Sequence, residues 1–207
     1  MNNNFDDIVF NRHSVKAFDA NTKISKEEML QIIEETCKAP SALNMQPWRF
    51  VVVASPEGKS KLRPLVGPNT TQNDTSSAMI LIFGDMKSWE KADEIYTEAV
   101  NKGFMSEKEK EAMMNRVLPM YEKMSETKLR EMAKVDSSLA AMQLMLVARK
   151  HGYDTNPIGG FDASKLAETF GLDPKRYIPV IIIAIGKADY EIRKSVRLET
   201  EKLVKFL

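Results

Sequence analysis

The sequence has 207 residues, enough for one domain with a full hydrophobic core, and we expect a single domain over residues 1–207. Hydrophobic residues make up 43% of the chain and charged residues 29%, which is typical of a folded protein and excludes a largely disordered one. The formal net charge of +1 favours neither nucleic acid nor an acidic membrane surface as a partner.

Cysteine and histidine are scarce. One cysteine and two histidines cannot build a disulfide framework or a zinc cluster of the usual spacing, so we expect no metal. The first residues lack the charged-then-apolar pattern of a signal peptide, and no apolar run approaches the ~20 residues that span a bilayer. We therefore expect a cytoplasmic protein without a membrane partner.

A short helix is expected at 5–10, and it leads into a polar run at 12–16. If that run is extended, alternate side chains share a face. One face would carry Arg12, Ser14 and Lys16, and the other His13, Val15 and Ala17. Two cations and a hydroxyl on one face suit a phosphate or another anion, although a solvated strand edge has the same pattern.

A capping box at 25–28 predicts the start of the next helix, which we expect to continue to Pro40. Its buried face is marked by Met29, Ile32, Ile33 and Cys37. The loop at 40–47 follows, and it carries polar side chains at Ser41, Asn44 and Gln46. Such a loop is either a helix-to-strand connector with an Asx-type turn or a ligand-binding loop. In both cases we expect Trp48 to pack in the core beneath it.

Apolar runs predict strands at 50–54, 78–83 and 179–186. Because these runs do not alternate, we expect helices to cover them on both faces. A turn at 55–58, a helix at 59–65 and a polar loop at 67–73 are expected between the first two strands. Asn69 and Gln72 are the candidate ligand-binding residues of that polar loop.

Residues 86–134 are highly charged, helical in propensity and rich in methionine, with interruptions at 102–103 and 119. They form either a helical layer with methionine as filler or a mobile lid over a pocket that accepts varied shapes. Asp136 or Ser137 is expected to cap the next helix, which ends at Gly152 and is apolar around nearly its whole circumference. Such a helix must be buried on every side, which in a chain of this size means a central helix or a subunit interface.

Residues 153–162 are expected to form a glycine-rich turn into a helix at 163–170. Gly159 and Gly160 would let the backbone approach a flat ligand closely and offer it amide donors. The cations and hydroxyl at 193–197 either bind a phosphate or belong to a solvated tail, and a short amphipathic segment at 199–207 follows them.

The runs 12–18 and 39–50 together resemble the two N-terminal signatures of the nitroreductase family of flavin enzymes, and 157–161 resembles a third segment of that family. The pattern Pro-Ser-x-x-Asn-x-Gln-Pro-Trp, from Pro40 to Trp48, is the most specific match. The resemblance implies an α+β fold, with a central, mostly antiparallel or mixed sheet flanked by helices in an intertwined homodimer. It also implies that 86–134 borders the substrate channel.

The same resemblance implies tightly bound FMN, with NAD(P)H as a transient reductant, and it gives each candidate residue a role. Arg12 and Arg197 would bind the phosphate, with Arg193 or Lys194 as a further ligand and His13 in the same group. Ser14, Asn69 and Gln72 would contact the ribityl chain and ring edge, and Lys16 would lie at N1/O2. Pro157, Ile158, Gly159 and Gly160 would pass near N5. Pro40, Ser41 and Asn44 would contact the flavin held by the neighbouring subunit.

Some family members carry a glutamate where this sequence has Gly159, so their substrate preferences do not transfer. No Gly-x-Gly-x-x-Gly follows a strand, so NAD(P)H would stack on the flavin itself. We expect an FMN-dependent NAD(P)H oxidoreductase that reduces nitroaromatics, quinones or similar small aromatic acceptors by a ping-pong mechanism. The alternatives are a non-enzymatic flavin sensor or store, a narrower activity such as reductive dehalogenation or flavin fragmentation, and a chain that binds no flavin.

Overall fold

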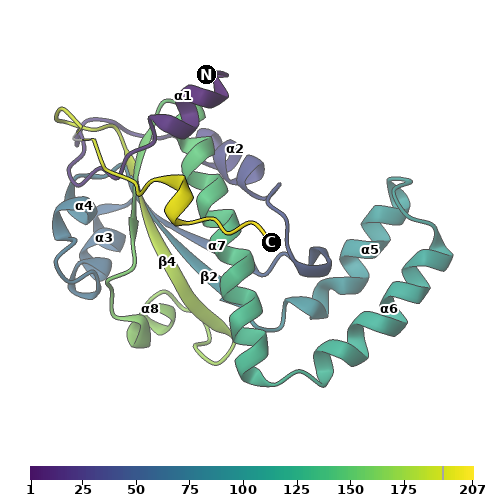
Figure 1. The fold of residues 1–207 in the computed structure, drawn as a ribbon. Coiled ribbons are helices and arrows are strands. Elements are labelled where there is room, and N and C mark those ends of the chain that lie inside the picture. The colour runs from purple at the N-terminus through teal and green to yellow at the C-terminus, as the bar shows by residue number, and fades with distance from the viewer. Residues whose placement is uncertain (193) are drawn as a thin grey trace.

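The computed structural model describes residues 1–192 and 194–207, and one antiparallel sheet lies at its centre (Figure 1). Within the described residues the sheet has four strands in the order β1-β2-β4-β3. They are β1 (Trp48–Val53), β2 (Ala78–Asp85), β3 (Asp154–Ile158) and β4 (Tyr177–Gly186). The expected α+β architecture, with a mostly antiparallel sheet flanked by helices, is confirmed.

The two central strands contribute to a core on each face of the sheet. In β2, Ile80 and Ile82 pack toward one core, whereas Met79 and Leu81 pack toward the other. In β4, Ile183 packs in the core of Ile80 and Ile82, whereas Ile182 packs in the core of Met79 and Leu81. This double burial explains why both strands are apolar without alternation.

The outer strands differ from the expectation. β1 lies at an edge of the sheet, and Val52 remains 38% exposed because the covering helices leave this rim partly open. Two covered faces were therefore the wrong expectation for β1. β3 occupies the opposite edge, where a glycine-rich turn was expected, and its proline, Pro157, is tolerated there because an edge strand needs only one row of hydrogen bonds.

Helices cover both faces of the sheet (Figure 1). The 25-residue helix α7 (Glu126–Lys150) crosses one face beside α2 (Lys26–Thr36). The other face is covered by α3 (Pro56–Leu62) and α8 (Ala163–Thr169). The short helices α1 (Phe5–Phe10) and α4 (Thr70–Thr75) pack against α7 and α3 respectively. The residue ranges of α1 and α8 agree with those expected from the sequence.

Several helix boundaries in the structure differ from those expected from the sequence. α2 ends at Thr36, before Pro40 is reached. Of its predicted capping box, only the Ser25 side chain accepts from the Glu28 N–H, because the Glu28 carboxylate accepts from the Tyr153 hydroxyl instead. The turn expected at 55–58 is the start of α3, capped by Ser55, and the loop expected at 67–73 contains the start of α4.

α7 begins at Glu126 with Ser125 as its cap, so Asp136 and Ser137 lie inside the helix and do not cap it. The helix is central, as expected. It is not buried all round within one chain, because Val135, Leu139 and Met142 are 61%, 44% and 43% exposed.

Residues 86–134 form a 3-10 turn at Ser88–Lys91, the helices α5 (Ala92–Asn101) and α6 (Glu107–Glu122), and the first turns of α7. α5 and α6 form a hairpin that projects away from the sheet (Figure 1). Gly103, with a φ of 72°, follows the end of α5 as expected, but Pro119 lies within α6 and does not interrupt it.

The C-terminal tail crosses in front of α7 in Figure 1. Its expected amphipathic segment contains a 3-10 turn at Thr200–Lys202, and Phe206 is 92% exposed. Among the described residues, every helix is too short or too polar to serve as a membrane span.

Candidate functional site

A cleft of about 390 Å³ brings together the chain just after α1 and the C-terminal tail. Arg12 and His13 line one side, and Lys194, Ser195 and Arg197 line the other. The polar run at 12–16 and the cationic tail, distant in sequence, therefore meet as one group. Arg193, the alternative partner of Arg197, lies outside the described residues.

The charges in this cleft are not balanced. Burial, and then the charge of Arg197, lower the pKa of the Arg12 guanidinium. In the part of the chain that the structure describes, no carboxylate forms an ion pair with Arg12, Lys194 or Arg197. Two guanidiniums that repel each other, and that have no ion-pair partner among the described residues, favour an anionic ligand in this cleft.

The run at 14–16 lies beside β3. The Val15 N–H donates to the Thr155 carbonyl at 3.0 Å, and Ser14 pairs with Thr155 as an isolated parallel bridge. Val15 is buried while Ser14 and Lys16 are exposed, so the predicted alternation holds here. It fails at His13, which lines the same cleft as Arg12 because the chain is still leaving the turn after α1.

The end of β3 lies against α4. The Asn69 amide donates to the carbonyls of Val66 and Gly160 at 3.0 and 3.1 Å, and the buried Gln72 donates to Asn69 Oδ1 at 3.2 Å. The two candidate amides thus hold the 159–160 segment that follows Pro157 and Ile158. The fold therefore brings together another group of candidates here.

Gly159 and Gly160 present open backbone. Among the described residues, a Cβ atom on Gly159 would meet no protein atom within 4 Å, and one on Gly160 would meet only Asn69 Nδ2, at 3.8 Å. Packing within the chain therefore does not require glycine at either position. Within the described residues, neither N–H of this pair donates to a protein acceptor, so both are available to a ligand.

Pro40, Ser41 and Asn44 lie elsewhere in the chain. Asn44 lines a second cleft, of about 530 Å³, beside α5, and this cleft shares no lining residue with the first. Ser41 Oγ accepts from the Gln46 N–H at 3.0 Å, so its hydroxyl is used inside the loop. Within one chain, this loop does not join the other candidates.

Sequence reasoning missed two contributors. The Tyr190 hydroxyl accepts from the Lys16 N–H at 3.0 Å, and it ties the tail to the run at 12–16. The buried Asp85 binds Arg49, which in turn holds the 40–47 loop. An aromatic residue just before the cationic tail was the available signal for Tyr190, whereas Asp85 carries none beyond an acid at the end of an apolar strand.

Comparison with known proteins places this geometry in context. The family model described as Nitroreductase family matches residues 9–187. YdgI of Bacillus subtilis, provisionally named an NAD(P)H nitroreductase, is 48% identical over 204 residues, which are 99% of this chain and 98% of that protein. The CLA biosynthesis enone reductase of Lactiplantibacillus plantarum is 41% identical over an alignment of 208 positions, which covers 100% of this chain and 96% of that protein.

A solved structure of the same family has nearly the same fold. A provisionally named nitroreductase from Exiguobacterium sibiricum, solved in complex with FMN, matches with a TM-score of 0.97 at 46% identity. The match covers 100% of this chain and 99% of that one.

Proposed function

The chain belongs to the nitroreductase family, and from this premise we propose that it is an FMN-dependent NAD(P)H oxidoreductase. Bound FMN would supply the redox chemistry, taking a hydride from NAD(P)H and passing electrons to an acceptor. The protein would bind, orient and tune that group.

The observation that carries this proposal is the set of cations in the first cleft without an acidic partner among the described residues. FMN has a dianionic phosphate, and guanidinium groups match phosphate oxygens with paired N–H donors. Arg12 and Arg197 would hold the phosphate, with Lys194 and His13 beside them. Ser14, Asn69 and Gln72 would face the ribityl chain and ring edge, and Lys16 would lie near N1/O2.

The open N–H groups of Gly159 and Gly160 suit the edge of a flat ring. We propose that a homodimer completes the site, because Pro40, Ser41 and Asn44 lie apart from the other candidates in one chain. The exposed apolar stripe of α7, formed by Val135, Leu139 and Met142, would supply part of the interface. The lone half-buried thiol, Cys37, suits a cytoplasmic location.

Nitroaromatics and quinones are the proposed acceptors, admitted beside the methionine-rich α5–α6 hairpin acting as a lid. A second candidate is reduction of an α,β-unsaturated ketone. It is favoured by the whole-length similarity to the Lactiplantibacillus plantarum enone reductase and by a solved enone reductase structure that matches with a TM-score of 0.92.

Steady-state kinetics of the FMN-loaded protein test the proposed function. The donor is NADH or NADPH, and the acceptors are one nitroaromatic, one quinone and one α,β-unsaturated ketone. If donor and acceptor use one pocket in turn, double-reciprocal plots should be parallel and each substrate should compete with the other. Intersecting lines together with a ternary complex would contradict the shared pocket, and no turnover with any acceptor would favour a flavin-binding module.

A further inference from the structure

The loop between α2 and β1 contains an unusual concentration of backbone strain. Leu43, Asn44 and Gln46 have φ angles of 52°, 60° and 45°, in the left-handed region that residues with a Cβ rarely adopt. We call residues 41–46 the strained turn. Such conformations persist only where the surroundings over-determine them, and they concentrate at ligand-binding sites.

Hydrogen bonds from three elements hold the strained turn. Asp136 of α7 accepts from the Ala42 N–H at 3.1 Å, and the Tyr96 hydroxyl of α5 donates to the Leu43 carbonyl at 3.1 Å. At the end of the turn, Arg49 of β1 donates through one nitrogen to the carbonyls of Gln46 and Trp48, at 2.9 and 2.8 Å. The strain is thus maintained by the rest of the fold.

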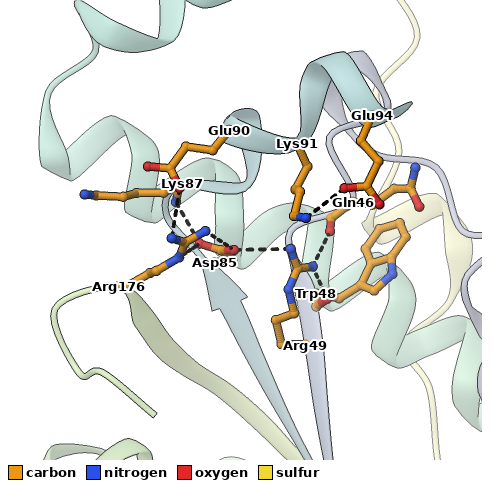
Figure 2. Close-up of polar contacts among 9 residues, drawn as sticks. All are labelled: Gln46, Trp48, Arg49, Asp85, Lys87, Glu90, Lys91, Glu94 and Arg176. Atoms are coloured by element: carbon orange, nitrogen blue, oxygen red, sulfur yellow. Dashed lines mark hydrogen bonds and ion pairs between the residues drawn. The ribbon is translucent and has the colours of Figure 1, made fainter. Parts of the chain in front are cut away.

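Arg49 is itself held by a buried acid (Figure 2). The Asp85 side chain has no exposed surface, and its Oδ2 accepts from Arg49 at 3.2 Å. The same carboxylate accepts two bonds from Arg176, at 2.9 and 3.0 Å, and one from the Lys87 N–H. Figure 2 shows Arg176 and Arg49 on opposite sides of Asp85, and of these two only Arg49 reaches the turn.

We propose that Arg49 and Asp85 are positioning residues, which fix the strained turn in the conformation that presents Asn44 and its neighbours to the flavin. Asp85 acts through Arg49, because its carboxylate orients the guanidinium whose other nitrogen holds the turn. This inference rests on the proposed function. It goes beyond it by assigning a role to a network that touches neither the cationic cleft nor its residues.

Arg49→Lys and Arg176→Lys form a matched pair for the test. Each keeps a positive charge beside Asp85, and each removes an arginine that is partly exposed at 35% or 27%. A lysine at 49 cannot span Asp85, Gln46 and Trp48 together, whereas Arg176 makes no contact with the turn. Dissociation constants for FMN and for riboflavin, with the melting temperature, are measured for the FMN-binding protein and both variants.

We expect Arg49→Lys to weaken FMN and riboflavin equally, by fivefold or more, because the phosphate is assigned to Arg12 and Arg197 and the turn would contact a part of the flavin that both ligands share. Arg176→Lys should change both dissociation constants less than twofold. It should lower the melting temperature about as much as Arg49→Lys does. Equal binding losses in both variants would reduce the network to general stability and overturn the inference. If Arg49→Lys does not fold, Tyr96→Phe, which removes the hydroxyl bound to Leu43, should weaken both flavins in the same way, and its failure to do so would also overturn it. A wild-type chain that binds no FMN would instead refute the proposed function.

Discussion

Arg12 and Arg197 share the cationic cleft, and they give the sharpest test at the scale of single residues. Replacing either with alanine should weaken FMN far more than riboflavin, which lacks the phosphate. A hydrogen bond to a charged group is worth roughly 1.5–3 kcal/mol. Arg63→Ala is the control, since Arg63 pairs with Asp74 on the exposed surface outside this cleft. Equal weakening of both flavins would move Arg12 and Arg197 away from the phosphate.

Lys16 offers a different readout. Its side chain is exposed and its backbone N–H is held by Tyr190. A cation beside N1/O2 interacts more strongly with reduced flavin, which carries negative charge there, than with oxidised flavin. Lys16→Met should therefore leave FMN bound and lower its midpoint potential by roughly 20–40 mV. An unchanged potential with weaker FMN would assign Lys16 to the phosphate.

Asp136 gives a prediction about pH. The residue is 7% exposed, and burial raises the pKa of its carboxyl although the Ala42 N–H acts in the opposite direction. The folded chain therefore binds the proton more tightly than the unfolded chain does. Stability conferred by this group is lost as the pH rises from the ordinary value of 3.8 through the raised folded pKa.

Asp136→Asn keeps an oxygen for the Ala42 N–H and removes the buried charge. It should be more stable than wild type at pH 7, and the difference should vanish in acid. Urea unfolding across a pH series measures this. An asparagine variant that is less stable at pH 7 would mean that the charge is favourable where it lies.

At the residue scale, sequence patterns found the candidates but not their partners. The exposed positions of Ser14 and Lys16 follow from alternation around the buried Val15. The contacts of Lys16 with Tyr190 and of Asn69 with Gly160 join residues 174 and 91 positions apart, and no local pattern encodes such distances. The Asp85–Arg49 pair was missed for the same reason.

At the scale of elements, α7 separates folding from assembly. Leu144 is fully buried against the sheet of its own chain, whereas Met142 is 43% exposed on the same helix. Leu144→Asp should abolish folding, since losing the packing of a core leucine alone costs about 2–5 kcal/mol and the charge adds to it. Loss of the dimer and flavin would follow from unfolding.

Met142→Asp should keep the chain folded, with its unfolding free energy changed by roughly 0.5 kcal/mol, and yet dissociate the proposed homodimer. Circular dichroism and light scattering of both variants check this contrast. A Met142→Asp protein that remains dimeric would place the interface elsewhere, and a wild-type monomer that retains FMN would contradict the composite site.

Most elements could be predicted where periodicity and capping agree, as in α2, α8 and the central strands. The start of α7 was predicted too late, because Asp136 and Ser137 are residue types that often cap helices. In the structure both are buried inside the helix. β3 was missed because Pro157 and the following glycines indicate a turn. Its pairing with β4 is a long-range contact that overrides this local preference.

At the scale of the whole molecule, one arrangement accounts for the separate clefts. The 159–160 segment follows β3 and lies against α4, and the run at 14–16, which follows the cationic cleft, pairs with β3, while the strained turn lies beside α5. In the proposed homodimer, a second copy of the chain would bring the two groups together around one cofactor. The family signatures indicated this from sequence, but neither the acceptor nor the choice between NADH and NADPH has a comparable signal.

Anaerobic mixing tests the central claim most directly. The FMN-loaded protein is mixed with NADH or NADPH, and the flavin absorbance is followed in the absence of any acceptor. An FMN-dependent oxidoreductase should lose that absorbance rapidly with at least one donor and regain it when an acceptor is added. An absorbance that stays constant for minutes with both donors would contradict the assignment.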